Sequence, residues 1–456
     1  MKEQIFISFK PQTGPGLPAF GWAGKRPLRS VVSPPACLRE VYGPAREGWR
    51  NRLYWGENLQ VMGHLLQTFR GKIDLIYLDP PFDSSADYKR TITLRGGTPG
   101  EERAVLRETQ YGDTWICEEY LQFMYERLIL MRELLSPRGS LYLHCDYRRS
   151  HYLRMLLDEV FGPGCFRNEI LWCYSIGGKG ERFFGRKHDS IFWYSKTQDY
   201  YFDGKSPHVA ARRKPNSHMK LQTDAAGRQY QEKRDRKSGK VYRYYIDEGK
   251  IPEDYWTDIE QLNREDRERV GYPTQKPEAL LKRIIAASAP PGGLVFDPFM
   301  GSGTTQAAAM KLDRRFLGAD SNPGAVETVT RRLLTAGREL EGTPGFGVYQ
   351  VGRSAPQRPA AGAEAVRADG RLVIRAFRPA RLLEKLSLPR ETDWRRLVDS
   401  VMIDWHYDGA VLRPETVDIP EKNALVRGVY DIPEDCGTIR VKITDLRSES
   451  MEIEVP

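Results

Sequence analysis

Short apolar runs alternate with helical patterns over most of this chain, and that alternation limits the folds open to it. Runs such as IDLIYL (73–78) and SLYLHC (140–145) have the length of buried strands, while residues 118–135 carry apolar side chains at helical spacing. Strands that read as continuous apolar runs between helices are typical of sheets buried on both faces. The sequence therefore predicts an α/β fold with a mostly parallel sheet covered by helices.

The alternation breaks off between Tyr200 and Gly271 and then returns. Residues 203–250 hold thirteen Lys and Arg against six Asp and Glu, with tyrosines between them. After this stretch come a helical pattern, a strand with a glycine-rich end, and a further helix and strand. We therefore expect one sheet built from residues 49–200 and 272–340, interrupted by a basic insertion at 201–271.

The two ends of the chain have a different composition. Residues 1–48 are rich in Pro and Gly, which favours an irregular arm, and residues 341–370 have the Gly, Pro and Ala content of a linker. Residues 371–456 contain alternating runs such as GTIRVKITDL and a helical pattern near Trp394–Met402. They predict a small accessory module of α+β or β type.

Charge and cysteine content narrow the class of protein. The 456 residues include 70 Lys and Arg against 61 Asp and Glu, a formal net charge of +9 that favours a polyanionic partner. Six cysteines without a CxxC pair argue against a zinc knuckle or a disulfide framework. The apolar runs are too short for a signal peptide or a membrane span, so we expect a cytoplasmic protein with no membrane partner. The segment GSGTT lacks the lysine of a P-loop, which argues against an NTPase.

The tetrapeptide Asp79-Pro80-Pro81-Phe82 directly follows the strand pattern at 73–78. It would therefore emerge at the carboxyl end of a parallel strand, where open α/β sheets bind their ligands. Proline removes backbone donors and leaves carbonyl acceptors, and Asp79 adds a charged acceptor, so the loop suits a substrate that donates hydrogens, such as an amino group. Phe82 offers a flat apolar face on which a base rotated out of a duplex can stack. Taken alone, the same residues also fit a turn with a capping Asp and a buried Phe.

A second loop follows a later strand pattern and precedes a helical one. Its glycines at 301 and 303 let the backbone approach a ligand closely, and the helix N-terminus presents free N–H groups. Asp320 stands seventeen residues after Gly303 at the end of the next strand pattern, a spacing at which a carboxylate reaches ribose hydroxyls. Glycine loops alone are common, but together these features predict a site for a nucleoside-bearing cofactor. The loop reads Phe296-Asp297-Pro298-Phe299-Met300-Gly301-Ser302-Gly303-Thr304-Thr305.

The order of these segments resembles the β-group amino-methyltransferases of bacterial restriction-modification and related defence systems. In that family a DPPY/F motif precedes a variable target-recognition region, a TQKP segment and an FxGSGTT-like loop. This chain has Asp79–Phe82, the basic insertion, Thr274–Pro277 and Phe296–Thr305 in the same order. The resemblance covers roughly residues 50–335, and the ordered set is far more specific than any one motif.

The resemblance implies a Rossmann-like, circularly permuted S-adenosylmethionine-dependent methyltransferase fold with a mostly parallel sheet of seven strands. It assigns catalysis to Asp79, Pro80, Pro81 and Phe82. The methyl transfer would need no metal, because the sulfonium methyl is already activated. Thr274 and Lys276 would help hold the methionine end of the cofactor. In YWGENL this chain has Glu57 where the family commonly has Asp. The full predicted cofactor set is Glu57, Asn58, Thr274, Lys276, Asp297, Pro298, Phe299, Gly301, Ser302, Gly303, Thr304 and Asp320.

We expect the substrate to be double-stranded DNA, whose target base is rotated out of the helix and methylated on an exocyclic amino group. The Asp at the head of the motif favours adenine N6, because the motif of cytosine N4 enzymes usually begins with Ser. Enzymes that methylate RNA or a protein glutamine more often have Asn there. A DNA-binding module without activity would keep the charge and need neither loop. A restriction or defence partner encoded elsewhere and a homodimer are both left open.

Basic residues in and just before the insertion are the candidates for contacting DNA. They offer phosphate contacts beside aromatic stacking faces, and the alternative is an ordinary solvated loop. Residues 85–90 and 111–115 also resemble the family and are expected to border the base pocket. The predicted DNA-contacting residues are Lys179, Arg182, Arg186, Lys187, Arg212, Arg213, Lys214, Arg234, Arg236 and Lys237.

Overall fold

The fold is taken from a computed structural model of the chain. It describes residues 3–9, 20–82, 86–96, 105–113, 115–175, 182–210, 215–263, 265–272, 274–340, 342–352, 361–386, 388–389, 392–421 and 424–455. At 86–91, 105, 107–113 and 361 it describes the backbone alone.

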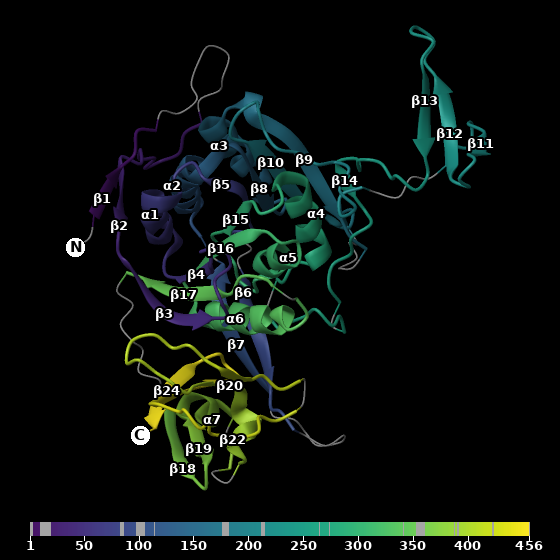
Figure 1. Cartoon of the computed structure of the whole chain (residues 1–456). Coiled ribbons are helices and arrows are strands. Elements are labelled where there is room, and N and C mark those ends of the chain that lie inside the picture. Colours follow the sequence, from purple (N-terminus) through teal and green to yellow (C-terminus); the bar gives the residue numbers. More distant parts are fainter. Residues whose placement is uncertain are drawn as a thin grey trace.

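Within these ranges, a ten-stranded sheet forms the centre of the molecule (Figure 1). Six adjacent strands, from β8 to β17, run parallel to one another, and β10 and β3 continue the sheet antiparallel at either side. This confirms the predicted α/β fold with a mostly parallel sheet. The strands lie in the order β14 (Tyr255–Trp256), β9 (Phe166–Cys173), β10 (His188–Ser195), β8 (Leu135–Cys145), β5 (Ile73–Leu78), β15 (Leu294–Asp297), β16 (Arg315–Asp320), β4 (Asn51–Trp55), β17 (Phe346–Val351) and β3 (Ala36–Tyr42).

Helices cover both faces of this sheet and bury it in two cores. One core contains apolar residues of α1 (Asn58–Phe69), α2 (Cys117–Leu134) and α3 (Ser150–Phe161). The other contains residues of α4 (Glu278–Ser288), α5 (Thr304–Lys311) and α6 (Pro323–Gly337). Side chains of β5 alternate between them, with Ile76 and Leu78 in the first core and Leu75 and Tyr77 in the second. A strand buried on both faces must be apolar at almost every position, which is why 73–78 reads as a continuous run.

The two separated segments of the sequence share this sheet. β15 from the second segment pairs in parallel with β5 from the first, in the register Val295↔Leu75 and Phe296↔Ile76. On its other side β15 pairs with β16, and β16 pairs with β4. The strands that carry the later motifs therefore lie in the middle of the sheet, between strands that precede them in the sequence.

The sheet has more strands than the seven that the resemblance implied. β3 comes from the expected irregular arm, β17 from the expected linker, and β14 from the basic insertion. β17 pairs with both β4 and β3, so the chain after α6 returns to the sheet before it leaves the domain. Pro and Gly around these short strands obscured them, since such residues mark turns and also bound strands.

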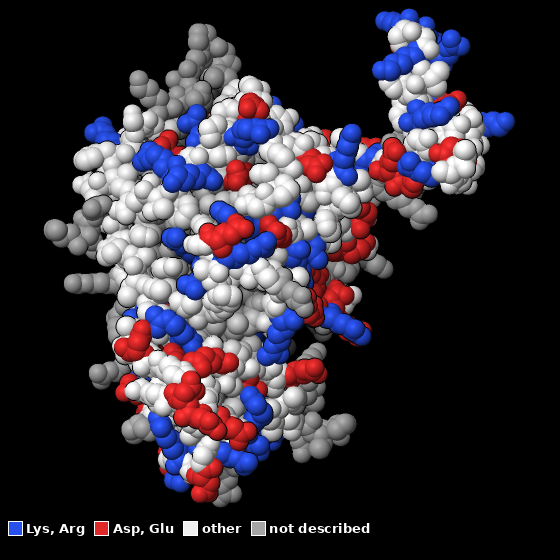
Figure 2. All heavy atoms as spheres, viewed as in Figure 1, with Lys and Arg blue, Asp and Glu red and all other residues white. Residues whose placement is uncertain are grey.

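The middle of the insertion forms a small antiparallel sheet of its own. β11 (Leu221–Thr223), β12 (Gln229–Arg234) and β13 (Val241–Tyr245) stand away from the body of the molecule at the upper right of Figure 1. Most of their side chains are exposed. Figure 2 shows Lys and Arg side chains over this projecting sheet. It presents basic charge at a distance from the catalytic body.

The C-terminal module is mainly β structure with its own apolar core. The helical pattern near Trp394–Met402 was a wrong prediction, because only Trp394–Leu397 forms a 3-10 turn and the strand β20 (Val398–Asp404) follows. A continuous apolar run fits either state, and here β20 is a buried central strand. The other elements are β18 (Ala361–Ala368), β19 (Arg371–Pro379), α7 (Ala380–Leu386), β21 (Thr416–Asp418), β22 (Val429–Asp431), β23 (Ile439–Asp445) and β24 (Ser450–Val455).

Buried contacts join this module to the α/β body. The Nζ of Lys442 on β23 lies 2.7 Å from Oε1 of Glu40 on β3 and 2.5 Å from Oε1 of Glu327 on α6. A hairpin, β6 (Ala86–Thr93) and β7 (Val105–Asp113), leaves the body just after Phe82 and reaches the module (Figure 1). Its Ile92 packs in one cluster with apolar residues of the module. The module is therefore packed onto the body through charges and apolar contacts.

An antiparallel pair at the N-terminus completes the described strands. β1 (Glu3–Phe6) pairs with β2 (Ser30–Ser33), and β2 contacts α1. Residues expected to be irregular thus form strands that cover the outer side of a helix.

Candidate active site

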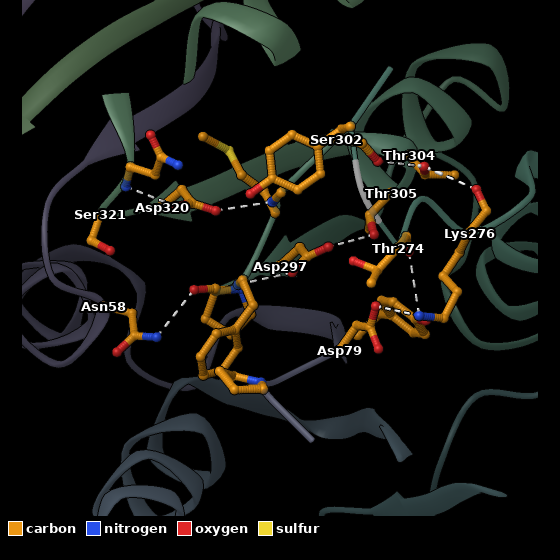
Figure 3. Close-up of a pocket in the computed structure, with 18 of the residues that line it drawn as sticks. Asn58, Asp79, Thr274, Lys276, Asp297, Ser302, Thr304, Thr305, Asp320 and Ser321 are labelled. Carbon is orange, nitrogen blue, oxygen red and sulfur yellow. Dashed lines mark hydrogen bonds and ion pairs between the residues drawn. The ribbon is translucent and has the colours of Figure 1, made fainter. Parts of the chain in front are cut away.

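Three carboxylates meet at one edge of the central sheet, where neighbouring parallel strands end (Figure 3). Asp79 follows the last residue of β5, and Asp297 and Asp320 end β15 and β16. In Figure 3 Asp297 lies in the middle, with Asp320 on one side and Asp79 on the other. All three line one pocket of about 360 Å³, which also includes the first residues of α1. The two loops therefore lie side by side and border one pocket.

Asp79 has one paired and one unpaired carboxylate oxygen. Its Oδ2 accepts a hydrogen bond of 2.6 Å from Nζ of Lys276, and both side chains are largely buried. Its Oδ1 is buried and has no hydrogen-bond partner within the described part of the chain. A buried acceptor without a donor costs about 1–3 kcal/mol. A ligand that brings an N–H or O–H to this oxygen would recover that free energy.

Lys276 connects Asp79–Phe82, the predicted catalytic loop, to the glycine loop at Phe296–Thr305. Its ammonium pairs with Asp79, and its backbone carbonyl accepts a hydrogen bond of 3.1 Å from Oγ1 of Thr304, the first residue of α5. The ammonium also lies 5.3 Å from the centre of the Phe82 ring. Lys276 lines the pocket, as predicted, but its charge is directed at Asp79. Nearby Thr274, also in the pocket wall, has a φ of 59°, a backbone conformation that residues other than Gly rarely adopt.

The ring of Phe82 rests on a buried histidine. The rings of Phe82 and His144 are nearly parallel, at 28°, with centroids 5.9 Å apart. His144 is fully buried on β8, with Nδ1 3.0 Å from the hydroxyl of Tyr77 and Nε2 3.0 Å from Oδ2 of Asp189. Burial alone would raise the pKa of Asp189, but hydrogen bonds from His144 and Tyr174 keep it below its ordinary value. A closed polar network thus fixes the platform beneath Phe82.

Both carboxylate oxygens of Asp297 accept hydrogen bonds from residues of its own loop. Oδ1 accepts the backbone N–H of Phe299 at 3.0 Å, and Oδ2 accepts the hydroxyl of Thr305 at 2.5 Å. Burial raises the pKa of Asp297 to about 7, against the lowering effect of these hydrogen bonds, and the nearby Asp79 and Asp320 raise it further. Its charge is therefore costly unless a cation enters the pocket.

Asp320 holds the glycine loop from the neighbouring strand. Its Oδ2 accepts the backbone N–H of Gly301 at 3.0 Å, and its Oδ1 accepts that of Asn322 at 2.9 Å. Burial raises the pKa of Asp320 to about 6, although both backbone hydrogen bonds lower it. Each carboxylate oxygen has a second lone pair, so Asp320 can still accept a hydroxyl from a ligand.

The two glycines of the loop have different tasks. Gly301 lines the pocket at a φ of 45°, and a Cβ there would lie 3.2 Å from the ring of Tyr272. Gly303 has a φ of 73° and lies behind the pocket wall, where a Cβ would lie 2.7 Å from a methyl group of Val329 on α6. Gly303 therefore does not line the pocket, contrary to the prediction, and instead allows the loop to pack closely against α6.

Glu57 and Asn58 lie at the pocket at the N-terminus of α1. Glu57 caps the helix, since its carboxylate accepts the backbone N–H groups of Leu59 and Gln60. Arg127 of α2 forms an ion pair with Glu57 and donates a 2.6 Å hydrogen bond to Oδ1 of Asn58. The amide of Asn58 in turn donates to the carbonyl of Pro298 at 3.3 Å. Arg127, absent from the predicted set, thus ties α1 to the glycine loop.

Aromatic rings form the wall of the pocket next to Pro298. The rings of Phe123 and Phe299 are 6.1 Å apart, and those of Trp115 and Phe123 are 4.8 Å apart. All three side chains line the pocket. The resemblance placed Trp115 near a base pocket, whereas here it joins the glycine-loop side. A flat aromatic ligand would find stacking faces on this wall.

A family model described as DNA methylase matches residues 73–331, more than half of the 456 residues. The chain belongs to this DNA methylase family. The matched range contains Asp79–Phe82, the insertion and the glycine loop, while Glu57 and Asn58 of the pocket precede it.

Three relatives agree with the family assignment. Type II methyltransferase M.EcaI of Enterobacter cloacae is 30% identical over 330 residues, which cover 62% of this chain and 69% of that protein. DNA adenine methyltransferase YhdJ of Escherichia coli strain K12 is 27% identical over 266 residues, or 58% of this chain and 77% of that protein. The Mod subunit of the type III restriction-modification enzyme StyLTI of Salmonella typhimurium is 26% identical over 337 residues, or 58% of this chain and 50% of that protein.

Sequence reasoning missed several residues of this methylase site. His144 and Asp189 support Phe82 from β8 and β10, and Arg127 holds the start of α1. A signal was present for His144, because a histidine inside the apolar run 140–145 needs buried hydrogen-bond partners. Arg127 sits in a helical pattern where a charged residue usually points to solvent, so no local signal marked it.

The predicted DNA-contacting residues of the methylase are spread over two regions. Arg182, Arg186 and Lys187 lie in the segment that leads into β10. Arg234 ends β12, and Arg236 and Lys237 lie in the turn between β12 and β13. Arg186 donates a 2.7 Å hydrogen bond to the hydroxyl of Tyr147. Lys179, Arg212, Arg213 and Lys214 lie outside the described residues, as do the side chains of 86–90 and 111–113 expected beside the base pocket.

The described residues contain no group of three or more His, Cys, Asp and Glu side chains arranged to hold a metal ion. None of the helices found there has the length and apolar character needed to cross a membrane. The predictions of a metal-independent reaction and of a cytoplasmic location stay predictions.

Proposed function

We propose that the protein transfers a methyl group from S-adenosylmethionine to N6 of adenine at a specific site in double-stranded DNA. The observation that carries the proposal is the free Oδ1 of Asp79, which lies in the same pocket as the glycine loop. Membership of the DNA methylase family and similarity to a relative named DNA adenine methyltransferase support the same reaction and the same base.

The pocket suits S-adenosylmethionine, a nucleoside that carries a cationic sulfonium and an amino-acid end. Asp320 lines the pocket and would accept ribose hydroxyls, and the rings around Phe299 would stack on the adenine. Asp79 and Asp297 add negative charge that favours a cation. When bound, the cofactor supplies a methyl group already activated for transfer. Asn58, Thr274, Pro298, Gly301, Ser302 and Thr304 would complete its binding site.

The catalytic loop binds the amino group of a base rotated out of the duplex. The base stacks on Phe82 beside Pro81, and its amine donates one hydrogen to Oδ1 of Asp79 and the other to the carbonyl of Pro80. Positive charge develops on the nitrogen as the methyl group is transferred. A fixed carboxylate stabilises that charge more in the transition state than in the ground state, and the proton leaves afterwards.

Lys276 positions Asp79 for this role. By pairing with Oδ2 it keeps the carboxylate in one orientation and leaves Oδ1 as the acceptor for the amine. Its carbonyl contact with Thr304 links that orientation to the start of α5, which borders the cofactor pocket. Lys276 thus contacts both Asp79 and the border of the cofactor pocket.

The basic insertion is the proposed reader of the DNA sequence. Its projecting sheet carries exposed Lys and Arg beside tyrosines, a combination that binds phosphates and stacks on bases (Figure 2). Similarity to a Mod subunit of a type III enzyme supports a place in a restriction-modification or phage-defence system with a partner encoded elsewhere.

Methylation of plasmid DNA by the purified full chain tests the proposal. After incubation with S-adenosylmethionine, the DNA is digested to nucleosides and analysed by mass spectrometry, and single-molecule sequencing locates the modified site. N6-methyladenine at one recurring site is the expected result. N4-methylcytosine would move the proposal to the other base, and unmodified DNA together with cofactor binding would refute it.

A further inference from the structure

An aromatic and basic cluster lies at the catalytic edge of the sheet, outside the pocket. It consists of Tyr147, which follows β8, and Phe183, Phe184 and Arg186, which precede β10. β10 pairs antiparallel with β8, with Ser190 opposite Cys145, so the chain enters β10 at the edge where the parallel strands end. Asp79 emerges at this same edge from β5, the neighbour of β8.

The apolar rings of this cluster face solvent. Phe184 is 98% exposed and Phe183 59% exposed, and Tyr147 is 43% exposed. Singly exposed apolar residues are common, but adjacent bulky aromatic residues flanked by charge mark an interaction site. Such rings gain free energy when a partner covers them.

Arginine side chains contact two of the rings, Tyr147 and Phe183, next to the exposed Phe184. The guanidinium of Arg186 lies 4.1 Å from the centre of the Tyr147 ring and 4.8 Å from that of Phe183, and that of Arg148 lies 5.2 Å from the Tyr147 ring. The Nζ of Lys187 is held 2.9 Å from the carbonyl of Ser175. Aromatic faces interleaved with fixed cations suit a polyanion with stacked bases better than an apolar protein surface.

The same segment is joined to the platform of Phe82. Asp189, at the start of β10, accepts the hydrogen bond of His144, and His144 stacks on Phe82. The exposed rings and the proposed base-binding ring thus belong to one connected structure.

We propose that Phe184 inserts into the duplex and fills the space that the target adenine leaves when it rotates into the pocket. The inference rests on the proposed DNA methylation. Apolar side chains that wedge between base steps unstack and kink the helix, which compensates for part of the cost of base rotation. Phe183 and Arg186 then contact the flanking backbone and bases.

The test compares two DNA substrates that contain the recognition site located by the sequencing experiment of the proposed function. One is fully paired, and the other has an abasic residue opposite the target adenine, so that its rotation costs less. For Phe184→Ala we expect kcat/KM on the paired duplex to fall about 10- to 100-fold, and kcat/KM on the abasic duplex to stay within about threefold of the wild type. With 2-aminopurine at the target position, the variant should also lose most of the fluorescence rise that reports the rotated base.

Phe6→Ala is the matched control, because Phe6 on β1 is 77% exposed in an unrelated part of the fold. It should behave as the wild type on both substrates. An equal loss for Phe184→Ala on both duplexes, or no loss on either, would overturn the wedge. If the wild type itself methylates neither duplex, the proposed DNA methylation is wrong. That result differs from failure of the Phe184 proposal, in which the wild type is active.

Discussion

The two loops of the active site each present an aspartate at the end of a parallel strand, yet the two carboxylates differ in their hydrogen bonds. Asp297 has both oxygens bonded within its own loop, to Phe299 and Thr305. Asp79 has one oxygen bonded to Lys276, and the other has no hydrogen-bond partner among the residues that the structure describes. The first carboxylate maintains a fold and the second is available for chemistry. Hydrogen-bond satisfaction therefore distinguishes Asp297 from Asp79, the proposed catalytic acid, more sharply than sequence position does.

The largest effect is expected from removing the charge of Asp79. Asp79→Asn keeps the shape of the side chain, so kcat should fall about a thousandfold while the Kd for S-adenosylmethionine changes by less than about threefold. Methylation at saturating cofactor and isothermal titration calorimetry measure the two quantities. A variant whose kcat stays within about tenfold of the wild type would place the acceptor of the amine elsewhere.

A smaller loss of kcat is expected from Lys276→Met, which removes the charge that orients Asp79. We expect kcat to fall about a hundredfold with little change in the Kd for the cofactor. Added ethylamine should restore part of the activity of Lys276→Ala, which a purely structural role would not predict. Lys282→Met is the control, since Lys282 on α4 lies outside the pocket lining and its Nζ is 3.4 Å from Oε2 of Glu278 on the same helix. A large rise in the cofactor Kd with unchanged kcat would instead indicate that Lys276 binds the cofactor, as the resemblance implied.

The raised pKa values of the cofactor-side acids predict a pH effect. In the folded chain the pKa is about 7 for Asp297 and about 6 for Asp320, both above the usual 3.8. Between the usual pKa of 3.8 and the raised pKa of each group, the folded state holds a proton that the unfolded state has lost. The free energy of unfolding therefore falls as the pH rises through this range. A cationic cofactor favours the ionised forms. Its binding near about pH 6.5 should release protons, and its Kd should rise about tenfold between about pH 7.5 and 5.5.

Calorimetry in two buffers of different ionisation enthalpy measures the proton release. Equal binding enthalpies in both buffers would show that neither carboxyl changes its protonation when the cofactor binds. The stability part is measured separately by denaturant unfolding at several pH values without cofactor.

The smallest effect is expected from Asp297→Asn. The amide oxygen still accepts the N–H of Phe299, and the amide nitrogen can donate to the hydroxyl of Thr305. The free energy of unfolding should therefore change by less than about 1 kcal/mol, while Asp297→Ala, which removes both partners, should cost about 2–3 kcal/mol. Urea unfolding measures both. A large loss of stability in Asp297→Asn would show that its charge, rather than its hydrogen bonds, supports the loop.

Local patterns predicted the elements that carry the site. The run 73–78 and the loop after it, and the strand, glycine turn and helix around 294–311, were all recognisable, because a strand between helices and a glycine at positive φ are set by neighbouring residues. The strands β3 and β17 were missed in segments rich in Pro and Gly. Their pairing depends on the edge that β4 leaves open, which no local pattern records.

By itself, the sequence determined the class of fold, the order of the two loops and the identity of their acidic residues, since these follow from periodicity and from residues adjacent in the chain. Only the tertiary structure decided that Lys276 pairs with Asp79, 197 residues away, that His144 supports Phe82, and that Gly303 serves packing. Those contacts arise from the order of strands in the sheet. That order results from the packing of two cores as a whole, and sequence spacing does not encode it.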